Sequence, residues 1–123
     1  MTQERLSLGK QGEELAIAQL RALKYKIIER NFKCALGEID IVAREKDMLV
    51  FVEVKTRRTK DFGGPAAAVN QRKQRQLSRV ALTYLNLKKL GEIPARFDVV
   101  AVELIPPTPR IEIIRNAFDL LYE

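Results

Sequence analysis

The sequence predicts a single α/β domain over residues 1–123, in which helices flank a mixed β-sheet. Apolar residues recur at helical spacing in two well-separated stretches. Two neighbouring segments between them alternate apolar and polar residues, as strands do. A strand, a long helix and a further strand then form a crossover unit, so these two strands should be parallel. The expected element order is therefore α-β-β-β-α-β-β-α.

The first element is an amphipathic helix, expected from about Leu6 to Lys24. One face of this helix carries Gly9, Glu13, Ala16, Leu20 and Leu23. Glu13 thus occupies a position where an apolar residue is expected, and the small residues Gly9, Gly12 and Ala16 should let the helix approach a sheet closely. The Glu13 carboxylate would then point inward. The alternative is a glutamate in solvent at the edge of the helix.

Three strands follow, at about Ile27–Lys33, Glu38–Arg44 and Met48–Thr56. The second and third form an antiparallel hairpin, because the turn-like sequence Glu45-Lys46-Asp47 lies between them. Both faces of the third strand are mostly apolar, so we expect it at the centre of the sheet.

The hairpin places two carboxylates and a lysine together. If Arg44 lies opposite Leu49, counting back along both strands places Asp40 opposite Glu53 on one face. Lys55 lies on the same face, because residues two apart in a strand point the same way. Facing carboxylates repel each other unless a cation compensates, and Mg²⁺ binds through one or two carboxylates and substrate phosphate oxygens. The alternative is an ordinary surface hairpin in which one carboxylate pairs with Lys55.

A basic loop from Arg57 to Pro65 follows the hairpin, with cations at Arg57, Arg58 and Lys60. It would suit a phosphate backbone leading to the carboxylates, and the alternative is a solvated loop. The next helix is expected from about Ala66 to Lys89. Lys73 lies near its start and could point toward the same edge of the sheet, as could Gln71.

The chain should end with two strands and a short helix. Phe97–Ile105 is almost continuously apolar and predicts a buried strand parallel to the third one. The proline-rich segment from Pro106 to Pro109 predicts a rigid turn. A last strand over Arg110–Ile114 and a short helix over Asn116–Leu121 complete the domain.

Composition excludes several kinds of catalytic site. The chain has no histidine and one cysteine, which excludes Ser-His-Asp and Cys-His catalysis, histidine-ligated zinc and any internal disulfide. Cys34 is interpreted as a structural residue of a strand. The net charge of +6 favours polyanionic partners. No apolar run approaches the ~20 residues that span a bilayer, and no signal peptide is evident, so we expect a cytoplasmic protein without a membrane partner.

With Asp40, Glu53-Val54-Lys55 and the helical Glu13 assembled, the sequence resembles the PD-(D/E)XK nuclease superfamily. More closely, it is similar to the bacterial YraN-like family, which is related to archaeal Holliday junction resolvases. The blocks that carry this similarity are Gly9-x-x-Gly12-Glu13-x-x-Ala16, Asn31, Gly37-Glu38-Ile39-Asp40, Phe51-Val52-Glu53-Val54-Lys55-Thr56-Arg57 and Arg96-Phe97-Asp98-Val99-Val100. One departure is Ile39, which stands where the superfamily's nominal proline precedes the aspartate. Proline takes no chemical part in phosphodiester hydrolysis, so this departure affects the assignment to the superfamily more than the expected mechanism.

The resemblance implies a restriction-endonuclease-like core, α-β-β-β-α-β, with an extra strand and a short C-terminal helix. It implies that Asp40 and Glu53 ligate Mg²⁺ or Mn²⁺, that Lys55 assists the nucleophilic water, and that Glu13 completes the catalytic site. Arg57, Arg58, Lys60 and Lys73 would contact nucleic acid. A homodimer would be expected if the substrate is a junction, because two sites must reach two strands.

The leading hypothesis is therefore a metal-dependent endonuclease that hydrolyses phosphodiester bonds of DNA, including branched or structured DNA. The residues themselves leave DNA and RNA both open. A second hypothesis is a non-catalytic nucleic-acid-binding protein that retains a nuclease fold. A third is a protein-interaction domain in which the carboxylates only form ion pairs.

Overall fold

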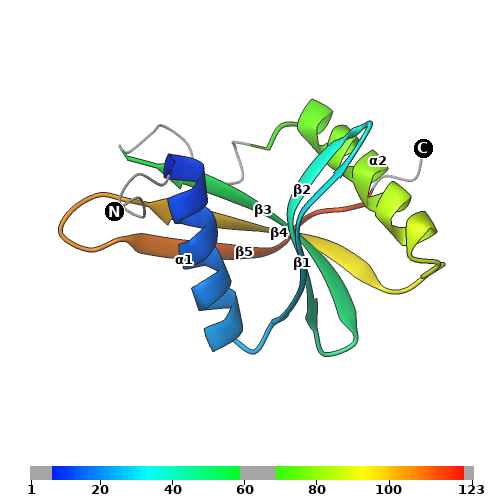
Figure 1. Cartoon of the computed structure of the whole chain (residues 1–123), viewed down its shortest axis with the longest axis horizontal. Helices are drawn as coiled ribbons and strands as arrows, with labels where there is room; N and C mark the ends of the chain where they lie inside the picture. Colours follow the sequence, from blue (N-terminus) through cyan, green and yellow to red (C-terminus); the bar gives the residue numbers. More distant parts are fainter. Residues whose placement is uncertain (1–6, 59–68, 121–123) are drawn as a thin grey trace.

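A five-stranded mixed sheet with one helix on each face forms the described part of the chain, which is residues 7–58 and 69–120 of a computed structural model (Figure 1). The elements are α1 (Leu8–Ala22), β1 (Lys26–Cys34), β2 (Gly37–Glu45), β3 (Met48–Arg57), α2 (Gln71–Leu87), β4 (Ala95–Glu103) and β5 (Arg110–Phe118). The predicted α/β class and mixed sheet are confirmed.

The strands lie in chain order, from β1 at one edge to β5 at the other. The β1–β2, β2–β3 and β4–β5 pairs are antiparallel, whereas β3 and β4 are parallel, as the crossover through α2 requires. The hairpin register pairs Arg44 with Leu49, as the sequence predicts. The central position of β3 is also confirmed.

The sheet separates two apolar cores. The α2 side contains Phe32, Phe51, Leu77, Tyr84 and Phe97, and the rings of Phe51 and Phe97 lie 5.5 Å apart. The α1 side is built from smaller residues, among them Ala16, Leu20, Ile41, Val52 and Val100. Alternate residues of β3 and β4 supply both cores, so both faces of these strands are buried.

Two predicted helix boundaries are wrong. α2 begins at Gln71, not near Ala66, because the side chain of Asn70 accepts the Lys73 N–H and caps the first turn. Val69 precedes the helix, and residues 66–68 lie outside the described residues, as does Pro65.

The C-terminal helix predicted over Asn116–Leu121 is also wrong. Residues 116–118 belong to β5, which continues through an irregularity opposite Phe97 and Val99. Asn116 has a left-handed φ of 51°, and its N–H donates to the buried Asp98 at 2.9 Å. A residue that suits a helix N-cap also tolerates this left-handed conformation, so the sequence pattern alone did not distinguish them.

Gly12 permits the close approach of α1 to β3. A Cβ atom placed on Gly12 would lie 1.8 Å from Oγ1 of Thr56, whereas one placed on Gly9 would meet nothing within 4 Å. The predicted role of small residues on α1 therefore holds for Gly12 and fails for Gly9, which is exposed.

We expect Gly12→Ala to destabilise the fold by about 1–3 kcal/mol, because either the helix or Thr56 must shift. The matched variant Gly9→Ala should be neutral or stabilising by up to about 1 kcal/mol, since alanine is the better helix former. Urea unfolding of both variants measures the difference. Equal stability of the two would contradict the close contact at Thr56.

Candidate functional site

Asp40 lies where β2 and β3 part. The paired register of the two strands ends at Ile41 and Val52, so Asp40 and Glu53 are the next residues along each strand. Oδ2 of Asp40 accepts the backbone N–H of Val54 at 2.8 Å, which satisfies a donor that the departing strand leaves free. Asp40 and Glu53 therefore interact through their side chains, just beyond the last paired residues of β2 and β3.

The two carboxyl groups share a hydrogen bond in a largely buried position. Glu53 is only 8% exposed. Burial, followed by repulsion from Asp40, raises the pKa of Glu53 from 4.5 to about 7. Burial also raises the pKa of Asp40, although the hydrogen bond from Val54 opposes this change. Both shifts have the same main cause, because burial disfavours the ionised form of each carboxyl group.

Two lysines lie near Glu53. Nζ of Lys73, from the first turn of α2, is 3.9 Å from Oε2 of Glu53, and Lys55 on β3 also acts on Glu53 through its charge. Both cations lower the pKa of Glu53, but burial and Asp40 outweigh them. The structure therefore brings together Asp40, Glu53, Lys55 and Lys73, whereas the side chain of Gln71 is exposed.

The Glu13 carboxylate contacts Asn31 of β1 and Lys10 of α1. Oε1 of Glu13 accepts Nδ2 of Asn31 at 3.3 Å and lies 3.9 Å from Nζ of Lys10. Its charge also raises the pKa of Asp40, which places it within electrostatic reach of the pair. Asn31 adopts a left-handed φ of 55° in β1, which turns its side chain toward α1. Sequence reasoning assigned no role to this contact.

The basic loop is described only at its start. Arg57 ends β3 and is half-buried, and Arg58 after it is exposed. Lys60 and the rest of the loop lie outside the described residues. Arg57 pairs with Glu103 in the β3–β4 register, so it begins the loop at a fixed place on the sheet.

The donor set at the strand ends fits a hard divalent cation. Two carboxylates meet there, and their shared hydrogen bond and raised pKa values show that the site favours added positive charge. Across residues 7–58 and 69–120, no three carboxylate or thiol side chains converge as a ready metal cage. Glu13 does not form such a group with Asp40 and Glu53 within the described residues. Mg²⁺ commonly uses one or two protein carboxylates and fills its remaining positions with water and phosphate oxygens.

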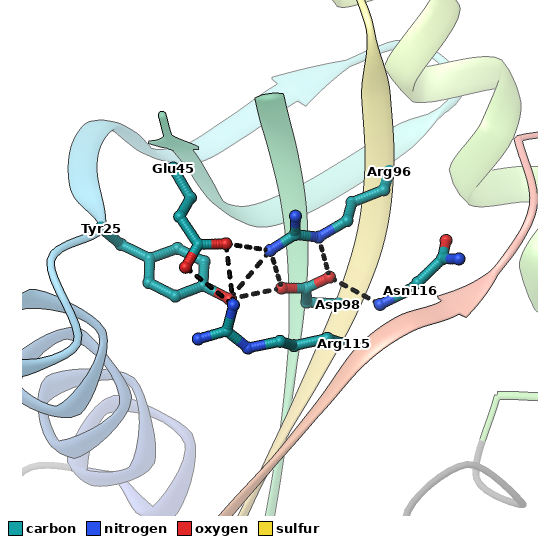
Figure 2. Close-up of polar contacts among 6 residues, drawn as sticks. All are labelled: Tyr25, Glu45, Arg96, Asp98, Arg115 and Asn116. Atoms are coloured by element: carbon teal, nitrogen blue, oxygen red, sulfur yellow. Dashed lines mark hydrogen bonds and ion pairs between the residues drawn. The ribbon is translucent and has the colours of Figure 1, made fainter. Parts of the chain in front are cut away.

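A second polar cluster, absent from the sequence predictions, lies past the C-terminal end of α1 (Figure 2). Asp98 is fully buried and accepts the Tyr25 hydroxyl at 2.8 Å and Nε of Arg96 at 2.9 Å. Arg96 and Arg115 both donate to Glu45 at the end of β2. The cluster thus ties β2, β4 and β5 to the residue that precedes β1. Its only sequence signal was a single aspartate inside an otherwise apolar strand.

Comparisons with known proteins give a consistent family match. The model of the uncharacterised protein family UPF0102 matches residues 12–102 of this chain. A UPF0102 protein of Geobacter sulfurreducens is 55% identical over 94% of this chain and 91% of its own length. Another from Syntrophus aciditrophicus is 51% identical over 99% of this chain and 95% of its own. Within the described residues, no helix has the length and apolarity needed to cross a membrane.

Proposed function

This chain belongs to the UPF0102 family, the YraN-like family of the sequence resemblance, and we propose that it is a metal-dependent nuclease hydrolysing phosphodiester bonds of DNA. The observation that carries the proposal is the largely buried pair of carboxyl groups of Asp40 and Glu53 at the ends of β2 and β3, with Lys55 and Lys73 beside Glu53. Two carboxyl groups held together in a largely buried position are more typical of a functional site than of a folding contact.

The arrangement of elements supports the same assignment. The order α1-β1-β2-β3-α2-β4 is the α-β-β-β-α-β order of the PD-(D/E)XK core, with β5 as an added edge strand. In this reading the site lies at the ends of β2 and β3, where the two strands separate and leave room for a substrate. The restriction-endonuclease-like fold is part of the proposal.

Asp40 and Glu53 would hold Mg²⁺ or Mn²⁺, which would neutralise phosphate charge and polarise the phosphorus–oxygen bonds. The hydrogen bond from the Val54 N–H holds Oδ2 of Asp40 and so orients this carboxyl group for binding a cation. Glu13 would adjust the charge around Asp40 from the α1 side rather than ligate.

Lys55 and Lys73 would bind and orient the anionic substrate. Lys55 projects on the Glu53 side of β3 and can stabilise charge that builds on the phosphate or orient the attacking water. Lys73 pairs with Glu53 while the carboxylates carry excess negative charge. Once that charge is neutralised, the Lys73 ammonium can contact a phosphate oxygen instead.

The test is a substrate panel of a four-way DNA junction, duplex DNA, single-stranded DNA and RNA, each with Mg²⁺, Mn²⁺ or EDTA. We expect cleavage of DNA only with the metal, and a loss on the order of 100-fold in Asp40→Asn. Asp47→Asn is the matched control, because Asp47 is exposed at the other end of the same hairpin. Cleavage that persists in Asp40→Asn, or that needs no metal, would refute the proposal.

A non-catalytic nucleic-acid-binding protein is the second candidate. It is favoured by the contacts of Glu13, which is engaged by Asn31 and Lys10 rather than directed at the carboxyl pair. It predicts salt-sensitive binding in the same panel, with no cleavage product and no effect of Asp40→Asn on affinity.

A further inference from the structure

All charged side chains of α2 are positive. Its 17 residues include Arg72, Lys73, Arg75 and Arg79 but no aspartate or glutamate. Cations in the first turns of a helix oppose the helix dipole, which is positive at its N-terminus. Neighbouring like charges three or four residues apart cost a few tenths of a kcal/mol more. Helix stability therefore does not explain this charge pattern.

Arg72, Arg75 and Arg79 form a row on the solvent side of α2, which we term the α2 arginine row. Their spacing of three and four residues places them along one face. The buried residues of the helix, such as Leu77, Ala81 and Tyr84, occupy the other side. All three arginines are exposed.

The arginines of the row also form no ion pair with any residue in the described part of the chain, whereas several other cations do. Arg30 pairs with Glu14, Lys88 with Glu29 and Arg115 with Glu45. A solvated helix face of an ordinary domain usually mixes both signs of charge. The row instead presents three guanidinium groups, the preferred partners of phosphate oxygens, without a carboxylate partner among residues 7–58 and 69–120.

The row begins beside the candidate site and leads away from it. Lys73, next to Arg72 in sequence, reaches Glu53, and Gln76 donates to the carbonyl oxygen of Leu36 before β2. The first turns of α2 are therefore anchored at the carboxyl pair. From Arg72 to Arg79 the helix rises roughly 10 Å, which is more than one phosphate spacing along a strand.

The described surface favours a duplex backbone over unpaired bases. Proteins that hold single strands usually stack bases on exposed aromatic rings. Among residues 7–58 and 69–120, every aromatic side chain is buried or half-buried, including Tyr84 on α2 itself. Guanidinium groups bind phosphate oxygens well, and most hydrogen bonds between proteins and DNA go to phosphate and sugar.

We propose that the α2 arginine row binds the sugar–phosphate backbone of a double-stranded nucleic acid that extends beyond the candidate site. The inference rests on the proposed function for its choice of a nucleic acid as the partner. It adds that this nucleic acid is double-stranded and that the α2 arginine row is the surface that binds it. The row holds the flanking duplex, while the carboxyl pair faces the phosphate to be cleaved.

The test measures binding without catalysis. The full chain is titrated in EDTA against a fluorescein-labelled DNA duplex of about two helical turns, at salt concentrations from about 50 to 200 mM. The triple variant Arg72→Gln/Arg75→Gln/Arg79→Gln should bind about 10- to 100-fold more weakly, with a salt slope shallower by about 2 to 3. Each single variant should reduce the slope by about 0.9. Glutamine has a helix propensity near that of arginine, so the fold should persist.

The matched control removes three exposed cations at the far end of the hairpin, Lys24→Gln/Lys26→Gln/Lys46→Gln. It has the same net charge as the row variant and should keep the wild-type slope. An unchanged slope in the row variant, or an equal loss in the control, would overturn the proposal. So would tighter binding of a single strand or of phosphatidylserine vesicles through the row.

Failure of this inference is separable from failure of the proposed function. If the wild type shows metal-dependent cleavage and the row variant has an unaltered salt slope, the nuclease proposal stands and the proposal for the α2 arginine row is refuted. If the row variant has a reduced salt slope but the wild type shows no cleavage, the proposal for the α2 arginine row stands and the non-catalytic candidate is supported. If the wild type binds no duplex, the row proposal fails regardless of the cleavage result.

Discussion

Glu53→Gln is expected to abolish metal-dependent cleavage and, at pH 8 without metal, to stabilise the protein by about 2–3 kcal/mol. The carboxyl pair is costly to the folded chain, because Glu53 is buried beside Asp40 and its pKa is raised to about 7. Glutamine keeps the shape of the side chain, adds no charge and can donate to the Asp40 carboxylate. The same substitution removes a proposed metal ligand.

The gain in stability should depend on pH in a defined direction. The folded-state pKa of Glu53 lies above its ordinary value of 4.5, so the folded state holds its proton more tightly than the unfolded state does. The contribution of Glu53 to stability therefore falls as pH rises from 4.5 to about 7 and then levels off. Glu53→Gln should be nearly neutral near pH 4 and reach its full gain above pH 7.

Urea unfolding at pH 4, 6 and 8 measures this difference, and each series is repeated with Mn²⁺. Mn²⁺ should raise the stability of the wild type and leave that of Glu53→Gln unchanged. Glu112→Gln is the matched control, because Glu112 is an exposed carboxylate on β5. A variant that is less stable than the wild type at pH 8, or one that Mn²⁺ stabilises equally, would contradict the role given to Glu53.

The carboxyl pair could be predicted because its determinants are local. A turn of two residues, Lys46 and Asp47, sets the hairpin register, and alternation along two strands then fixes which side chains share a face. The pairing of Arg44 with Leu49 confirms this register. The approach of α1 could be predicted for the same kind of reason, since Gly12 and Ala16 are small residues one helical turn apart.

The features of the fold that could not be predicted depend mainly on contacts between residues distant in sequence. Tyr25 and Asp98 are 73 residues apart, and no periodic pattern connects them. Asn31 and Asn116 adopt left-handed φ angles inside strands, a choice made by the partners of their side chains or N–H groups rather than by local propensity. The helix boundary at Asn70 was missed because capping competes with the apolar pattern that precedes it.

The largest loss of stability is expected for Asp98→Ala, at about 3–5 kcal/mol. Asp98 is fully buried and accepts hydrogen bonds from Tyr25, Arg96 and the N–H of Asn116 (Figure 2). Removing the carboxylate leaves three donors without that acceptor, one of them a largely buried guanidinium group. Arg96 keeps its ion pair with Glu45, but losing the buried Asp98 partner of a guanidinium group costs more than losing a neutral hydrogen bond, so this variant should lose more than Tyr25→Phe.

Graded variants separate the charge from the hydrogen bonds. Tyr25→Phe removes one donor and leaves Asp98 its other two partners, so about 1–2 kcal/mol should be lost. Glu112→Ala removes an exposed carboxylate and should change stability by less than about 0.5 kcal/mol. Urea unfolding at pH 7 measures all three. If Asp98→Ala costs no more than Tyr25→Phe, the cluster is a set of ordinary hydrogen bonds and not a buried charge network.

The position of Asp98 also connects this cluster with the carboxyl pair. Asp98 lies opposite Val52 in the β3–β4 register, and Val52 is the last residue of β3 paired with β2 before Glu53. The cluster therefore fixes β4 relative to β2 and β5, one residue before β2 and β3 part. Asp98→Ala should weaken metal binding to the remaining folded protein, whereas Tyr25→Phe should not, because only the former removes the contacts of Asp98 with Arg96 and Asn116. Calorimetry with Mn²⁺ at a temperature where both variants are folded distinguishes this effect from loss of the fold alone.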